Sequence, residues 1–203
     1  MDRLQGTLER VTFYSEETCY LVGRLKVKGL RELQTIVGVL PNPVTGEVLN
    51  LQGVWILHPE YGRQFKIEKF TRMTPVTVAG IERYLASGVI KGVGPATAKL
   101  LIEKFGKDVL DIIEKEPERL REINGIGAKK AAMITESFAN QKEMQQVILF
   151  FQEYGISPGY AARIYRALGE KTIPLVREDP YRLVDQVFGI GFKTADMIAR
   201  KIG

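Results

Sequence analysis

The pattern of hydrophobic and polar positions changes at Thr74-Pro75 and divides the sequence into two parts. Before this point, hydrophobic residues alternate with polar ones or form short β-branched and aromatic runs separated by glycine and proline. Such a pattern predicts β-strands, and we expect five of them, at 4–14, 20–28, 33–40, 49–57 and 64–72. Five short strands in about seventy residues fit a small closed barrel, because closure hides the strand edges.

After residue 75 the hydrophobic spacing is helical, and a seven-residue segment occurs four times. The copies start 33, 30 and 34 residues apart, a period typical of a structural repeat. They are GVGPATA at 92–98, GIGAKKA at 125–131, GISPGYA at 155–161 and GIGFKTA at 189–195. Apolar residues follow at helical intervals, although the second copy has Thr135 at one of these positions. Each segment therefore predicts a glycine turn that opens an amphipathic helix.

A second duplication relates larger pieces of the helical part. Three pairs of residues are each separated by 63 positions: Gly106 and Gly169, Pro117 and Pro180, Leu120 and Leu183. A proline is well suited to the first turn of a helix, where its missing amide is not needed. We therefore expect one two-hairpin unit repeated twice, and predict domains at 1–75, 76–140 and 141–203.

Composition excludes several classes of protein. Hydrophobic residues make up 45% and charged residues 26% of the 203 positions, as in ordinary globular proteins. Cys19 and His58 are the single cysteine and histidine, which excludes a disulfide framework, a cysteine-rich zinc site and catalytic sets needing several histidines. We expect Cys19 to pack at a strand start and His58, beside Pro59, to shape a loop.

The targeting and charge signals are weak. No apolar run approaches the ~18 residues of a membrane span, and the first residues lack the apolar core of a signal peptide; we expect a soluble cytoplasmic protein.

Lys and Arg number 29 against 24 Asp and Glu, a net charge of +5. Since residues 1–75 hold 10 basic and 8 acidic residues and the rest 19 and 16, neither part is a basic tail. Phosphate binding must come from local geometry.

The Gly-apolar-Gly turns offer that geometry. Glycines leave backbone amides uncovered, and the amides join the positive end of the helix dipole to form an anion site suited to a phosphodiester. The third copy has Ser157 instead of the second glycine and lacks a nearby lysine, so we expect it to be structural. The predicted DNA-binding residues of the other hairpins are Lys91, Gly92, Gly94, Thr97, Lys99, Gly125, Gly127, Lys129, Lys130, Gly189, Gly191, Lys193 and Thr194.

These segments resemble the helix-hairpin-helix family, whose tandem domains bind DNA through phosphates. HPEYGRQF at 58–65, after LQGVW at 51–55, and EDPYRLVDQVFGIGFKTAD at 178–196 resemble the N-terminal region of bacterial RecD-like ATP-dependent DNA helicases. The resemblance implies an α+β chain: a five-stranded oligonucleotide/oligosaccharide-binding (OB-like) barrel, then an all-α tandem helix-hairpin-helix domain with four hairpins. It also implies non-sequence-specific DNA binding in repair or recombination.

In that family a 5′-to-3′ motor, using ATP and Mg, follows the hairpin region, and we expect this sequence to stop short of it. A motor's phosphate loop needs Gly-x-x-x-x-Gly-Lys-Ser/Thr, and the nearest segment, 191–194, has Phe192 in place of the second glycine. We find no catalytic set, metal site or cofactor site. The carboxylates at 114, 116, 118 and 122 are expected on a solvated helix face.

In the barrel, aromatic rings beside basic residues suggest stacking on the bases of a single strand, and the candidate rings are those of Tyr20, Trp55, Tyr61 and Phe65. At least half of the aromatic residues are expected in the core, and Tyr61 and Arg63, near a predicted turn, are expected to be exposed. The predicted binding residues of the barrel are Arg24, Lys26, Trp55, Tyr61, Arg63 and Lys66.

Three alternatives remain open. Periodicity alone also fits an SH3-like barrel. A barrel with two hairpins resembles the branch-migration protein RuvA, which grips four-way junctions, although four evenly spaced hairpins argue against it. The repeats also fit a module that docks a protein, for example a single-stranded-DNA-binding protein. The expected partner is single-stranded or tailed duplex DNA, and no membrane.

Overall fold

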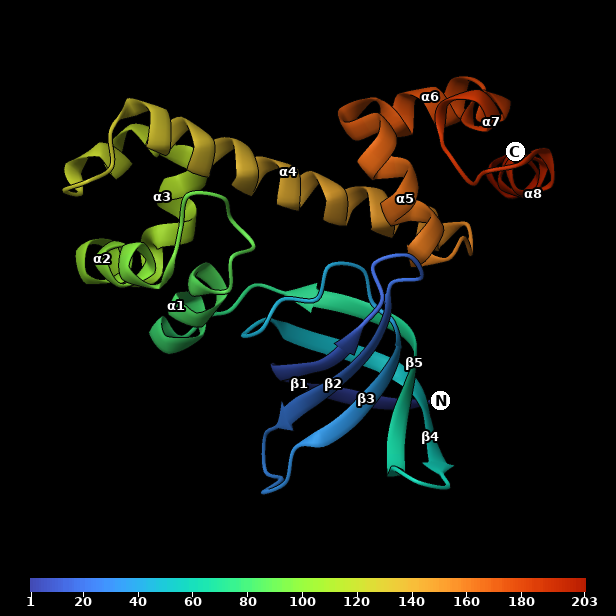
Figure 1. Ribbon diagram of the computed structural model, residues 1–203, viewed down its shortest axis with the longest axis horizontal. Coiled ribbons are helices and arrows are strands. Elements are labelled where there is room, and N and C mark those ends of the chain that lie inside the picture. The colour runs from blue at the N-terminus through green and yellow to red at the C-terminus, as the bar shows by residue number, and fades with distance from the viewer. The chain divides into compact units, whose positions relative to one another are not determined.

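The computed structural model describes all residues, 1–203, and its backbone forms two compact units, 1–139 and 140–203. The boundary falls inside the longest helix, α4 (Ala128–Glu153). The first unit holds a β-barrel and the helices up to the start of α4, and the second holds the remaining helices (Figure 1). The division into three domains predicted from the sequence stays a prediction.

The barrel consists of β1 (Asp2–Tyr14), β2 (Tyr20–Val27), β3 (Gln34–Val39), β4 (Val48–His58) and β5 (Gly62–Met73). All five predicted strands are confirmed to within two residues at each end. The strands close in the order β1-β2-β3-β5-β4, and β3–β5 is the parallel pair while the others are antiparallel. A five-stranded closed barrel with this order is an OB-type barrel, so the predicted fold class is confirmed.

Buried and exposed residues alternate along the strands, and the buried side chains fill the interior of the barrel. In β2, Leu21 and Leu25 are fully buried while Arg24 and Lys26 point outward, as the two-residue period of a half-buried strand requires. Phe65 of β5 is also fully buried, in agreement with the expectation that part of the aromatic set is core. Cys19 is buried just before β2, which confirms its predicted packing role.

A buried ion pair closes one end of the barrel. Glu47 Oε2 lies 2.8 Å from Arg72 Nε, and both side chains are almost completely enclosed. The second carboxylate oxygen of Glu47 accepts a hydrogen bond from the Val44 amide at 3.0 Å. The Arg72 guanidinium also donates to the Pro41 and Asn42 carbonyl oxygens. This cluster fixes the loop between β3 and β4 against β5.

Helix α1 (Val78–Ala86) follows the barrel. Thr77 caps it by accepting a hydrogen bond from the Gly80 amide at 3.1 Å, as threonine commonly does at this position. Arg83 of α1 forms a two-pronged ion pair with Glu9 of β1. Val44, from the loop before β4, packs in the same hydrophobic cluster as Ile81 and Leu85, so the first helices and the barrel share one unit.

The helical elements repeat as the sequence predicts. The first unit contains α2 (Pro95–Phe105), η1 (Gly106–Asp108), α3 (Val109–Lys115) and η2 (Pro117–Glu122), and then α4 begins. The second contains α5 (Pro158–Leu168), η3 (Gly169–Lys171), α6 (Thr172–Glu178), η4 (Pro180–Arg182), α7 (Leu183–Gln186) and α8 (Phe192–Ile202). None of the helices is long and apolar enough to cross a membrane.

The residues 63 positions apart occupy matching places. Gly106 and Gly169 end α2 and α5 with φ of 56° and 57°, values that favour glycine. Pro117 and Pro180 each begin a 3-10 helix. Leu120 and Leu183, which follow these prolines, are both fully buried. The predicted duplication is therefore present in the fold.

Tyr84 and Tyr165 are expected to lose their hydroxyl protons only at unusually high pH. Burial and the Glu47 carboxylate raise the pKa of Tyr84 to about 12, and partial burial and Glu143, which accepts a hydrogen bond from the hydroxyl, raise the pKa of Tyr165 to about 12. Since the folded pKa exceeds the ordinary value of about 10, these groups leave stability unchanged below pH ~10 and reduce it as the pH rises toward 12.

A spectrophotometric titration at 295 nm measures this directly. The wild-type protein should show absorbance changes near pH 12 from the ionisation of Tyr84 and Tyr165. Tyr84→Phe should remove one of these high-pH contributions, and Tyr165→Phe should remove the other. A single step near pH 10 would contradict the burial of these hydroxyls.

Candidate nucleic-acid interface

The first glycine of each repeated segment makes the turn. Gly92, Gly125, Gly155 and Gly189 all have φ between +66° and +89°, the left-handed region that other residues rarely adopt. The apolar residue that follows, Val93, Ile126, Ile156 or Ile190, is buried in every copy. The hydrophobic side chain therefore anchors the turn and leaves its backbone at the surface, as predicted.

The second glycine leaves a helix N-terminus open. Gly94 and Gly191 have extended backbone and precede α2 and α8, and no side chain caps either helix. A Cβ built at Gly94, Gly127 or Gly191 would meet no atom within 4 Å, and all three residues are exposed. Uncapped amides at a helix start can bind an anion. Three of the four turns therefore present an exposed glycine with free space around it at a helix start.

The third turn differs at the same position. The Ser157 hydroxyl accepts a hydrogen bond from the Tyr160 amide at 3.4 Å and so caps α5 with its own side chain. An amide that an anion could use is thereby already occupied. The geometry supports the expectation that this hairpin is structural.

The first and second hairpins lie together in the first unit. The Lys130 ammonium, near the start of α4, donates to the Thr97 hydroxyl of α2 at 3.3 Å. The Lys91 amide donates to the Ser137 hydroxyl of α4 at 2.9 Å. A Cβ at Gly92 would lie 3.3 Å from Ile134, so the first turn packs directly on the helix that the second turn opens.

Most of the predicted cations surround these turns. The side chains of Lys91, Lys99 and Lys129 are exposed, whereas Lys130 is half-buried by its contact with Thr97. The Thr97 hydroxyl oxygen accepts from Lys130, and its proton remains available to a further acceptor. The first two turns thus carry two open helix starts with four lysines beside them.

In the second unit, a side chain from the helix after each glycine turn donates a hydrogen bond to the backbone of the other turn. Lys201 of α8 donates to the carbonyl oxygen of Gly155 at 2.8 Å, and Arg163 of α5 donates to the carbonyl oxygen of Gly189 at 3.5 Å. Lys193 is exposed and Thr194 half-buried at the start of α8. The fourth turn therefore has an open helix start, a lysine and a guanidinium group in close proximity.

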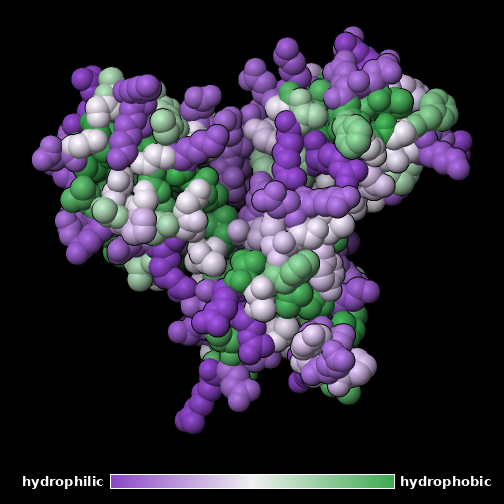
Figure 2. All heavy atoms as spheres, viewed as in Figure 1, coloured by the Kyte–Doolittle hydropathy of each residue, from purple (hydrophilic) through white to green (hydrophobic).

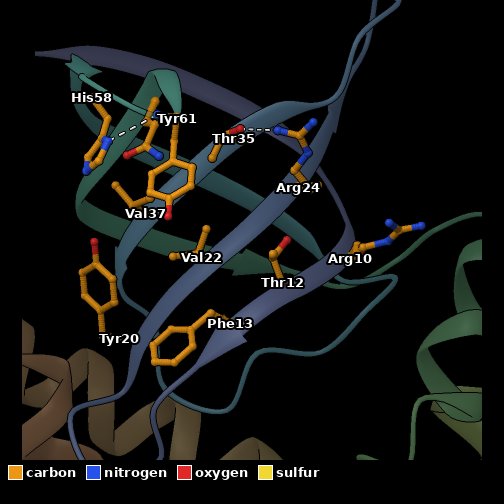
Figure 3. Close-up of a pocket in the computed structure, with 11 residues that line it drawn as sticks. Arg10, Thr12, Phe13, Tyr20, Val22, Arg24, Thr35, Val37, His58 and Tyr61 are labelled. Carbon is orange, nitrogen blue, oxygen red and sulfur yellow. Dashed lines mark hydrogen bonds between the residues drawn. The ribbon is translucent and has the colours of Figure 1, made fainter.

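The barrel carries a groove of about 720 Å³ on the outer face of β1, β2 and β3, next to the turn between β4 and β5. Figure 3 shows three aromatic rings around it, with Tyr61 near His58 at one end and Tyr20 and Phe13 at the other. Arg10 and Arg24 also line it, and Arg24 donates a hydrogen bond to Thr35. Rings and guanidinium groups of this kind suit the bases and phosphates of a single strand.

His58 positions one of these rings. Its Nδ1 accepts hydrogen bonds from the amides of Glu60 and Tyr61 at 3.1 and 3.3 Å, and its ring centroid lies 4.8 Å from that of Tyr61. The prediction that His58 shapes a loop is confirmed. Tyr61 is 70% exposed, as predicted for this turn.

The predicted barrel residues fall into three pairs in the structure. Tyr61 and Arg24 line the groove. Arg63, exposed as predicted, stacks on Trp55 at 4.0 Å from the ring centroid, and Trp55 packs edge-on against buried Phe65. The remaining two, Lys26 and Lys66, are exposed and do not line the groove.

Sequence reasoning left Phe13 and Arg10 out of the predicted binding set, whereas Tyr20, a candidate stacking ring, lines the groove. The pairing of β1 with β2 shifts register between Leu8 and Arg10 and again between Val11 and Phe13. Such bulges change which side chains face outward, and simple alternation cannot locate them.

The acidic cluster between α3 and η2 does not form one helix face, because the helix ends at Lys115 before Pro117. Glu116 and Glu122 instead pair with Arg119 at 3.3 and 3.4 Å. The structure contains no group of three or more acidic, histidine or cysteine side chains placed to hold a metal ion.

A five-stranded OB-type barrel followed by tandem helix-hairpin-helix units defines the class of this protein. Family models agree along the whole chain. Residues 1–75 match the OB-fold domain of the ATP-dependent DNA helicase YrrC, residues 82–140 a SAM-like helix-hairpin-helix tandem, and residues 140–203 the helix-hairpin-helix domain of the ATP-dependent RecD2 DNA helicase.

The ATP-dependent RecD2 DNA helicase of Deinococcus radiodurans is 24% identical over 201 residues, which cover 97% of this chain. The chain spans 28% of the length of that relative. Over nearly its whole length the chain is therefore similar to the N-terminal OB-fold and helix-hairpin-helix region of RecD2-type DNA helicases.

Proposed function

We propose that this chain is the DNA-binding N-terminal region of an ATP-dependent 5′-to-3′ RecD-like helicase that acts in cytoplasmic DNA repair or recombination. The observation that carries the proposal is the shared geometry of three hairpins: a left-handed glycine, a buried apolar residue and an exposed glycine before a helix, whose start is uncapped in the first and fourth copies.

The hairpins suit the DNA backbone rather than the bases. Backbone amides and the positive end of a helix dipole stabilise a phosphate oxygen whatever base is attached. Lys91, Lys99 and Lys129 add charge beside the turns of the first unit, and Lys193 beside the fourth. Binding through these groups is independent of sequence and weakens with salt, because counterions are released from the DNA.

Fluorescence anisotropy on single-stranded, 5′-tailed duplex and four-way-junction DNA across a salt series tests this proposal. If about four phosphates are held, the slope of log affinity against log salt on duplex DNA should be near −3.6. A strong preference for the junction would favour the RuvA-like function. No binding at low salt would contradict the proposal and favour a protein-docking module, with a single-stranded-DNA-binding protein as the first partner to test.

The barrel groove is proposed to hold a single strand. Phe13, Tyr20 and Tyr61 offer ring faces, and Arg10 and Arg24 lie within reach of phosphates. Each base stacked on a ring contributes ~1–3 kcal/mol, so the loss of one stack should lower the affinity about fivefold or more.

Tyr61→Ala combined with Arg24→Ala should therefore lower the affinity for an oligothymidine about tenfold or more, by removing one stack and one charge. Both side chains are exposed, so stability should hold. Trp55→Ala with Arg63→Ala is the matched control outside the groove; an equal loss from the control pair would assign binding to the Trp55 face instead.

In the longer protein, the ATP and Mg sites are proposed to lie in motor domains outside these residues, since no segment here forms a nucleotide-binding loop. Deleting the equivalent of residues 1–203 from such a helicase should change DNA affinity or unwinding. Unwinding and binding that stay unchanged would contradict a role for this region in DNA handling.

A further inference from the structure

The fourth hairpin carries exposed aromatic rings on both sides of its glycine turn. Phe188, directly before Gly189, is 99% exposed, and Phe192, directly after Gly191, is 66% exposed. The Phe192 ring stacks on Tyr181 at 5.4 Å between centroids with an angle of 25°. The Tyr181 hydroxyl donates to Asp196 Oδ1 at 2.9 Å, which fixes the pair. Figure 2 shows hydrophobic residues at the surface near α6, α7 and α8.

The corresponding positions of the other hairpins are different. Before the first glycine stand Lys91, Asn124 and Tyr154, and after the second position stand Pro95, Ala128 and Pro158. Tyr154 is half-buried against Phe150, with ring centroids 5.2 Å apart. Two exposed rings flanking one turn therefore occur only in the fourth copy.

Covering a fully exposed phenylalanine is favourable in water, so Phe188 offers binding energy to a ligand that lies over the ring. The surroundings are those of a phosphate ligand, not of an apolar surface. Lys193 is exposed next to Phe192, and the Arg163 guanidinium lies at the Gly189 carbonyl oxygen. A nucleotide whose base is unstacked supplies both an aromatic face and a phosphate.

The base must be unstacked because a base within a continuous duplex has both faces covered by its neighbours. Such a free face exists at a junction between duplex and single strand, where an apolar ring can insert or stack. The hairpins of the first unit lack this ring, and their lysines contact backbone alone under the function proposed above.

We propose that Phe188 stacks on an unstacked base at a duplex–single-strand junction while the fourth hairpin holds an adjacent phosphate, with Phe192 and Tyr181 forming a second ring surface. The inference rests on the proposed DNA-binding function and adds the preferred DNA structure. The second unit thereby recognises the fork, and the first unit binds the backbone of any duplex.

The test compares Phe188→Ala with wild type on a 5′-tailed duplex and on a blunt duplex of the same length. The tailed duplex should lose about tenfold in affinity, the loss of one base–aromatic stack, and the blunt duplex less than twofold. Phe188→Tyr keeps the ring and should restore tight binding. Leu149→Ala, at an exposed leucine of α4 in the same unit, is the control for a lost apolar side chain.

A 2-aminopurine at the junction nucleotide reports the contact itself. Its fluorescence should change on adding wild-type protein and respond little to Phe188→Ala at saturating concentration. If Phe188→Ala leaves the tailed duplex unaffected, or weakens both DNAs equally, the inference is overturned while DNA binding stands; an unaffected tailed duplex is the result that a protein-docking surface gives. If wild type binds neither DNA, the proposed function itself fails.

Discussion

Replacing Gly94 and Gly127 together by valine is expected to lower the affinity for duplex DNA at least tenfold. Both glycines are exposed, and a Cβ at either would meet no atom of the protein. The added side chains would instead stand in front of the amides that hold phosphates. Losing about two of four phosphate contacts should also reduce the salt slope from about −3.6 to about −1.8, measured by anisotropy.

Two controls separate this effect from misfolding. Gly94→Ser with Gly127→Ser should cap both helices as Ser157 caps α5, and so preserve or raise the melting temperature while still weakening DNA binding. Gly92→Ala should instead lower the melting temperature, because Gly92 has φ of +88° and a Cβ there would press on Ile134 at 3.3 Å. Valine and serine variants that bind DNA like wild type would show that the amides are not used.

Removing the buried Glu47 carboxylate is expected to have the largest effect on stability. Glu47→Ala leaves the Arg72 charge enclosed without its partner, which typically costs about 3–5 kcal/mol. For a chain of this size, that corresponds to a drop of roughly 6–20 °C in the melting temperature of the first unit, measured by circular dichroism or calorimetry.

Glu9→Gln is the matched control, because it breaks the more exposed pair with Arg83, and such pairs contribute about 1 kcal/mol or less. Replacing both partners, with Glu47→Leu and Arg72→Met, should recover much of the lost stability by removing the unpaired charge. If Glu47→Ala and Glu9→Gln prove equally mild, the Glu47–Arg72 pair does not hold the loop.

The hairpins could be predicted from sequence because their information is local. A left-handed glycine, a buried apolar residue and a helix start all fall within seven residues, and four copies define the register. The 63-residue duplication likewise follows from Gly106, Pro117 and Leu120, whose roles are set by backbone conformation and burial.

The features that escaped prediction depend on distant residues. Glu47 and Arg72 are 25 positions apart and look like ordinary surface charges until the barrel closes over them. The barrel groove depends on two register shifts in β1. Phe188 looks like one more apolar position of the last repeat, and only the fold shows that Val187 takes the buried place and Phe188 faces solvent.

A ¹H–¹⁵N NMR titration of the chain with a short duplex of arbitrary sequence shows whether the hairpin amides hold the DNA backbone. The amide signals of Gly94, Gly127 and Gly191, and those of Ala96, Ala128 and Phe192 near them, should shift or broaden, while those of the Ser157 turn stay in place. A second duplex of different sequence should shift the same signals. DNA-dependent shifts that spare these amides and fall elsewhere would contradict the account.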